Sequence, residues 1–194
     1  MVVLPYWLAE EETERKKIIL DPGLTFGTGA HPSTQMVMEA MEQRVQPGWH
    51  CLDLGSGSGI LSITALRLGA QSAVGVDIDP KAEKAAGENA ALNGFGFPEF
   101  QACTGSVTED PALMEKLAGN GHDFIFVNIV ADVIISLAPV LPKLAGDKGT
   151  VILSGILDTR LAEVEQALTR SGMDIIARKA KEEWRCLTAK RRQA

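Results

Sequence analysis

The stretch Leu52-Asp53-Leu54-Gly55-Ser56-Gly57-Ser58-Gly59-Ile60-Leu61 decides the fold. An apolar run from residue 50 to 54 stops at three closely spaced glycines, and a second apolar run follows from residue 60 to 68. This pattern predicts a strand, a tight turn and a helix, because glycine permits a sharp turn and lets the backbone approach a ligand closely. The N–H groups that open the helix would point toward that ligand. A turn that binds nothing is disfavoured, since three glycines weaken a helix start.

A carboxylate follows the next predicted strand at the distance expected for a nucleotide-like ligand. Asp77 lies about twenty residues past the first glycine, where a βαβ unit places an acid against ribose hydroxyls. The glycines are spaced G-x-G-x-G, and Ile60 stands where the dinucleotide fingerprint needs a small residue. The spacing therefore argues against a dehydrogenase and resembles the S-adenosylmethionine (SAM) loop of class I methyltransferases. Helix capping is the alternative role for Asp77, but Asp79, directly before Pro80, fits it better.

Length and composition limit the remaining possibilities. The 194 residues fit one domain, and 45% hydrophobic residues suffice for a core. A net charge of −6 provides no general basic field for nucleic acid. The three cysteines form no C-x-x-C pair, which fits a reducing cytoplasm and small core residues. No signal peptide, membrane-length apolar run or metal-ligand cluster is apparent, so we predict a cytoplasmic chain without a metal.

Predicted strands and helices alternate along most of the chain. This order predicts an α/β fold whose mostly parallel sheet carries helices on both faces and ends in an antiparallel hairpin. Pro139 is expected to kink or divide one helix. The expected strands are 18–20, 50–54, 72–76, 100–103, 122–127, 149–153, 173–180 and 184–189, and the expected helices are 35–45, 60–68, 81–92, 111–118, 130–144 and 161–171.

Residues 21–34 have the composition of a loop but include Leu24 and Phe26 between glycines. Loops of this kind often fold over a ligand. In parallel sheets, ligands bind beyond the carboxyl ends of the strands. The glycine loop, Asp77 and Asn128 all follow predicted strands at that end, so we expect them to converge.

With these positions assigned, the chain resembles the PrmA-type family of ribosomal protein L-eleven methyltransferases. Its most specific match is Asp21-Pro22-Gly23-Leu24-Thr25-Phe26-Gly27-Thr28-Gly29-Ala30-His31-Pro32-Ser33-Thr34, close to the family's D-P-G-x-A-F-G-T-G-x-H-x-T-T. The chain departs mildly from the family's motifs at Thr25 and Ser33 in this stretch, at Ser56 in the glycine turn and at Val130 after Asn128. Further matches follow in the family's order across nearly the whole chain: 53–61, 77–80, Asn89-Ala-x-x-Asn-Gly94, Asn128-Ile-Val-Ala131, 153–157 and Glu183-Trp184.

The resemblance also implies a domain organisation. Family members usually carry a separate N-terminal domain that recognises the ribosomal protein, whereas only about twenty residues precede the catalytic motifs here, by our loop boundary. We therefore expect an N-terminal segment, 1–20, followed by a SAM-dependent methyltransferase domain, 21–194, of the class I, Rossmann-like type.

The resemblance implies SAM as cofactor and assigns most of the site. Asn128 is the predicted catalytic residue, because its carbonyl can accept an N–H from a substrate amine and orient the nitrogen lone pair. For Thr34 and Asn128 the alternative is an ordinary place at a helix start. His31 is expected to organise its loop or to help remove a proton, and Trp184 to pack rather than to stack on a substrate. The predicted cofactor-binding residues are Phe26, Gly27, Thr34, Gly55, Gly57, Gly59, Asp77, Ile78 and Asn128.

The function implied by the resemblance is methylation of amines, either lysine side chains or the N-terminal α-amine, on ribosomal protein L-eleven or a related protein. The acidic chain would attract a basic protein. Two alternatives stay open: a small-molecule N- or O-methyltransferase, favoured if residues 1–17 build a pocket over the site, and a non-catalytic SAM-binding subunit. A nucleic-acid methyltransferase is disfavoured, since Asn128-Ile-Val-Ala131 lacks the N-P-P-Y pattern of base-amine enzymes. No direct nucleic-acid or membrane partner is expected, and the oligomeric state is unknown.

Overall fold

The computed structural model describes residues 1–23, 29–119 and 121–193. The main strands are β3 (His50–Leu54), β4 (Ser72–Asp77), β5 (Phe100–Thr104), β6 (His122–Asn128), β7 (Ala145–Leu157), β8 (Met173–Lys181) and β9 (Trp184–Arg191). The helices are α1 (Pro32–Arg44), α2 (Ile60–Leu68), α3 (Pro80–Leu92), α4 (Pro111–Ala118), α5 (Ala131–Leu137), α6 (Leu141–Leu144) and α7 (Leu161–Arg170), with short 3-10 turns at Tyr6–Leu8 and Asp158–Arg160.

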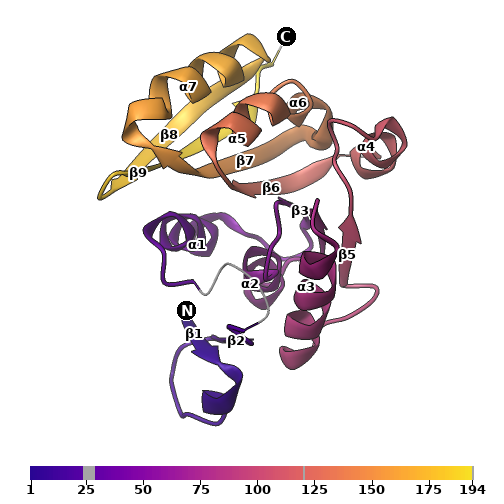
Figure 1. The fold of residues 1–194 in the computed structure, drawn as a ribbon, viewed down its shortest axis with the longest axis vertical. Coiled ribbons are helices and arrows are strands. Elements are labelled where there is room, and N and C mark those ends of the chain that lie inside the picture. The colour runs from indigo at the N-terminus through magenta and orange to yellow at the C-terminus, as the bar shows by residue number, and fades with distance from the viewer. Residues whose placement is uncertain (24–28, 120, 194) are drawn as a thin grey trace.

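Within the described residues these main strands form one seven-stranded sheet of order β5-β4-β3-β6-β7-β9-β8 (Figure 1). Strands β3 to β7 pair in parallel, and β9 pairs antiparallel with both β7 and β8. The predicted α/β class, with a mostly parallel sheet and an antiparallel end, is confirmed. The expected helix at 130–144 is divided into α5 and α6 around Pro139, because proline lacks the N–H that continues a helix.

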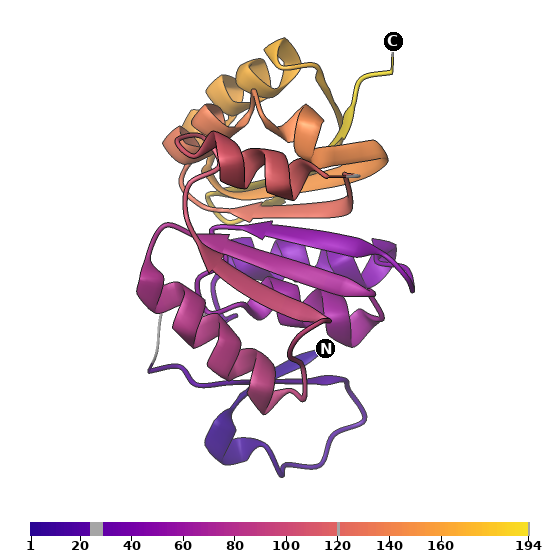
Figure 2. The same ribbon diagram turned by 90° about the vertical axis from the view of Figure 1, so that its right-hand side faces the viewer.

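Helices cover both faces of the sheet (Figures 1 and 2). One buried cluster joins α4, α5, α6 and α7 to the sheet, and the other joins α1, α2 and α3 to its opposite face. Neighbouring residues of β3 show the alternation: Leu52 belongs to the first cluster and Cys51 to the second, since successive strand side chains point to opposite faces.

A small unit precedes the main sheet. Strand β1 (Val2–Pro5) pairs in parallel with β2 (Lys17–Leu20), and Ile18 and Leu20 are buried in the same cluster as α1 and α2. The sequence predicts only the second of these strands, because Val2–Pro5 is a short apolar run that ends in proline and carries no alternation. In Figure 2 this unit lies at the opposite end of the molecule from α7.

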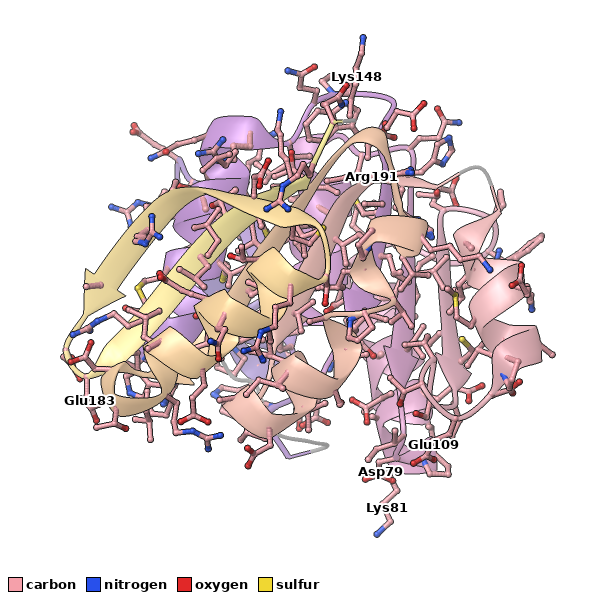
Figure 3. The ribbon with its side chains drawn as sticks, turned by 90° about the horizontal axis from the view of Figure 1, so that it is seen from above. Asp79, Lys81, Glu109, Lys148, Glu183 and Arg191 are labelled. Atoms are coloured by element: carbon pink, nitrogen blue, oxygen red, sulfur yellow. The ribbon has the colours of Figure 1, made fainter. Side chains whose placement is uncertain are left out.

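The ends of the strands lie on two opposite sides of the molecule. Figure 3 shows Asp79, Lys81, Glu109 and Glu183 on one side and Lys148 and Arg191 on the opposite one. Asp79 follows β4 and Glu109 follows β5, so the first side carries the carboxyl ends of the parallel strands. Within the described residues, no helix is both long enough and apolar enough to cross a membrane.

Candidate active site

A cavity of about 530 Å³ opens at the carboxyl ends of the parallel strands. It is lined by the turn after β3, the segments that follow β4, β5 and β6, and the start of α1. The predicted site residues that line it are Thr34, Gly55, Gly57, Asp77, Ile78 and Asn128. Gly59 lies directly beyond this turn as the residue before α2, whereas Phe26 and Gly27 lie outside the described residues.

The glycine turn is shaped by close backbone approach. Gly55 has a φ of +78°, and a Cβ at this position would lie 2.4 Å from Cγ2 of Ile129. Gly59 also has a φ of +78°, and a Cβ there would lie 3.1 Å from the Cα of Ala86 in α3. Only glycine fits both positions without displacement, so the turn is a cradle open to the cavity.

Asp77 is held in place by the backbone. Its Oδ2 accepts a hydrogen bond from the N–H of Gly57 at 2.9 Å, and its Oδ1 accepts one from the N–H of Asp79 at 3.0 Å. A carboxylate oxygen has two lone pairs, so each oxygen retains one for a hydroxyl in the cavity. Asp79 is the N-cap of α3, accepting from the N–H of Lys81 at 2.9 Å. The Asp77 carboxylate therefore faces the cavity, whereas the Asp79 carboxylate caps a helix.

Two polar atoms lie buried beneath the turn. Asp53 is 1% exposed, and its Oδ2 accepts hydrogen bonds from the N–H and the hydroxyl of Ser62, at 3.1 and 2.9 Å. Its Oδ1 and the hydroxyl of Ser56 have no hydrogen-bond partner among the described residues. Burial raises the pKa of the Asp53 carboxyl to about 7. Ser56 also lines the cavity, although its hydroxyl oxygen is itself buried.

Asn128 and Thr34 meet across the cavity. The Nδ2 of Asn128 donates to the Thr34 hydroxyl at 3.0 Å, although the two residues lie 94 positions apart. Asn128 does not cap α5, whose N-cap is Val130. Thr34 belongs to the first turn of α1, so it is both a helix residue and the partner of Asn128. With the amide nitrogen bonded to Thr34, the carbonyl oxygen of Asn128 is the acceptor that remains.

An aromatic pair completes one wall. His31 caps α1, with Nδ1 accepting from the N–H of Ser33, and its ring meets Trp184 edge to face at 4.6 Å. His31 therefore contacts the start of α1 and Trp184, and its role in organising the loop stays a prediction. Trp184 packs on His31 and also lines the cavity. The sequence alone does not predict this position, because Trp184 reaches the carboxyl ends of the parallel strands only through its pairing with Leu157.

Sequence reasoning missed another wall. Residues Gly105–Thr108, to which the sequence analysis assigns no role, line the cavity together with Ile129 and Val133. Their signal was positional: residues 105–108 follow β5 at the same edge that carries Asp77. Polar composition alone does not distinguish such a loop from a solvated one.

The glycine turn and the fixed carboxylate after β4 fit a polar nucleoside-like ligand. Together with the sheet order and its antiparallel end, they define the class of SAM-dependent methyltransferases, and SAM is the cofactor of this class. The family model described as "Ribosomal protein L11 methyltransferase (PrmA)" matches residues 1–192. The chain belongs to this family.

Individual relatives agree with this membership. The chain is 39% identical to the ribosomal protein L11 methyltransferase of Parasynechococcus marenigrum over 99% of its length, and 39% identical to that of Desulfosudis oleivorans over 98%. A solved structure of ribosomal protein L11 methylase from Lactobacillus delbrueckii subsp. bulgaricus superposes with a TM-score of 0.87 at 34% identity, covering 98% of this chain and 94% of that one. The chain spans 66% and 62% of the two curated relatives' own lengths.

Proposed function

We propose that this chain transfers methyl groups from SAM to amines, either lysine side chains or an N-terminal α-amine, of ribosomal protein L11 or a related protein. The observation that carries the proposal is the Asn128–Thr34 pair at the cavity wall. It presents an amide oxygen, the acceptor that a neutral amine needs, beside a cradle built for the cofactor. The family relationship supports the class of substrate.

The residues of the site divide the work. When bound, SAM supplies an electrophilic methyl group on a sulfonium. The glycine turn, the Asp77 carboxylate and Ile78 would hold the cofactor. Asn128 would accept an N–H of the substrate amine and aim the nitrogen lone pair, so its contribution is orientation. Lysine amines have a pKa of about 10.4, so the substrate must lose a proton before it reacts.

Two observations bear on the alternative functions. Residues 1–17, which would enclose a small-molecule substrate, contribute none of the residues that line the cavity. Residues 1–17 therefore build no pocket over the site, which favours a protein substrate over a small molecule. Asp77 and Asn128, whose loss would favour a non-catalytic subunit, are both present and both line the cavity.

The test is calorimetric titration of the chain with SAM, repeated with Asp77→Ala. We expect wild-type binding that the substitution weakens at least tenfold, which is about 1.4 kcal/mol. Transfer of labelled methyl to purified ribosomal proteins follows, and Asn128→Ala should reduce its rate about 100-fold or more. SAM binding without methyl transfer to any ribosomal protein would contradict the proposed substrate. If the folded chain did not bind SAM, the proposed methyltransferase activity would be contradicted.

A further inference from the structure

Two buried asparagines, one near the end of α3 and one directly after it, have no part in the site described so far. Asn89 and Asn93 lie one helical turn apart and are 0% and 7% exposed. A buried side-chain amide is costly unless its donors and acceptor are satisfied. Their hydrogen-bond partners therefore indicate what each side chain is for.

Asn93 serves the N-terminal unit. Its Oδ1 accepts from the N–H of Ile19 at 2.9 Å, and its Nδ2 donates to the Ile19 carbonyl at 2.6 Å. The side chain thus pairs with the edge of β2 that β1 leaves open, much as a neighbouring strand would. Its further contacts are with Arg67 and the Asn89 carbonyl, and neither residue lines the cavity.

Asn89 makes a different connection. Its Nδ2 donates to the carbonyl of Ser58, within the glycine turn, at 2.9 Å. Its Oδ1 accepts from the N–H of Asp21 at 2.8 Å, where the predicted cofactor-covering segment 21–34 begins. Since one partner is a carbonyl and the other an N–H, the network fixes which end of the amide is which. One side chain thus joins the turn to that segment.

The bond to Ser58 acts on the peptide that ends the cradle. The N–H of Gly59 donates to the Ser56 carbonyl at 2.8 Å, and Asn89 holds the opposite side of the same peptide unit through the Ser58 carbonyl. Gly59 adopts a left-handed conformation that leaves alternative backbone states open to it. Loss of the Asn89 donor would remove one hydrogen bond from the Ser58 carbonyl and favour rotation of this peptide.

We propose that Asn89 is a positioning residue for the cofactor: it holds the glycine turn in its binding conformation and ties it to the start of segment 21–34. Asn93, on the same helix face, supports only the fold. The inference concerns cofactor binding and rests on SAM as the cofactor, whatever substrate receives the methyl group.

The experiment compares Asn89→Ala with the matched control Asn93→Ala. Both variants lose a buried amide, so both should unfold at lower urea concentration than the wild type. Only Asn89→Ala should speed amide hydrogen exchange across residues 55–60 in the cofactor-free protein, by tenfold or more. In calorimetry, only this variant should raise the Kd for SAM at least tenfold, while Asn93→Ala stays within about twofold of the wild type.

Asn89→Asp separates the two bonds and serves if Asn89→Ala fails to fold. This change keeps an acceptor for the Asp21 N–H and loses the donor to Ser58. A protonated carboxyl regains a donor, so its Kd relative to the wild type at the same pH should improve as the pH is lowered. Equal effects of Asn89→Ala and Asn93→Ala on Kd, or unchanged exchange at 55–60, would overturn the inference. Failure of the wild type to bind SAM would instead overturn the cofactor.

Discussion

Single residues at this site act through the hydrogen bonds that they make. Asp77 accepts from the Gly57 N–H, Asn128 donates to the Thr34 hydroxyl, and Asp53 accepts from an N–H in the first turn of α2. Asp53 differs from the other two because it is enclosed in the protein and one of its oxygens has no partner among the described residues. Its charge is therefore the one most opposed by its surroundings.

The buried carboxyl of Asp53 predicts a pH-dependent stability. In the folded state the Asp53 carboxyl stays protonated up to about pH 7, whereas in the unfolded chain it loses its proton near the ordinary pKa of 3.8. The stability that this protonation contributes is fully present below pH 3.8 and is lost as the pH rises through about 7. Between pH 5 and 8, the wild-type free energy of unfolding should fall relative to that of Asp53→Asn, by an amount on the order of a few kcal/mol. Urea denaturation measures it, and parallel pH profiles of the two proteins would contradict it.

Which site residues the sequence can predict follows from how local their signal is. Gly55 and Asp77 belong to one strand–turn–helix–strand unit, so spacing alone indicates where they lie. Trp184 and the 105–108 loop reach the cavity only through strand register. The hydrogen bond from Asn89 to Ser58 spans 31 positions and appears only when α3 packs on the turn.

At the scale of elements, β7 extends four residues beyond each end of the predicted strand 149–153, and helix starts account for a smaller boundary difference. Both α1 and α3 begin with proline directly after a capping side chain, His31 and Asp79. The sequence predicts α3 closely, since aspartate before proline is a common start. It places the start of α1 three positions late, because histidine is an uncommon cap and residues 32–34 read as loop.

The cap of α3 gives a prediction matched to the cofactor test. Asp79→Ala removes the acceptor for the Lys81 N–H and should lower the free energy of unfolding by about 1 kcal/mol. The Asp79 backbone N–H that supports Asp77 remains, so SAM affinity should stay within about twofold of the wild type. Urea denaturation and calorimetry on the same variant measure both quantities. A loss of affinity equal to that of Asp77→Ala would refute this separation of roles.

For the whole molecule, the alternation of strands and helices predicts the class of fold but not the order of the strands. Neighbours such as β3 and β6 are separated along the chain by two other strands and three helices, and no local pattern specifies their pairing. The β1–β2 unit was missed in part for the same reason, since its two short strands are defined only by each other. The domain boundary at residue 20 stays a prediction.

Net charge gives a prediction at this largest scale that rests on the proposed protein substrate. A chain of net charge −6 should attract a basic ribosomal protein over a distance that salt shortens. Raising the ionic strength from about 0.05 to about 0.5 M should therefore raise KM several-fold while kcat changes little. Initial-rate methyl transfer at several salt concentrations measures it. A KM independent of salt would show that apolar contacts rather than charge govern the encounter.

The cavity joins parts of the chain that are distant in sequence. Asn128 bonds to Thr34 across 94 positions, and the Ser154 hydroxyl bonds to the Ser33 carbonyl across 121. We expect contacts between residues so far apart in sequence to form late in folding, because closing a long loop costs entropy before the contact can repay it. During synthesis, the glycine turn and Asp77 leave the ribosome well before β6 and β7 exist to complete the wall. A ligand bound by the finished cavity therefore offers no help to the nascent chain and stabilises only the completed fold.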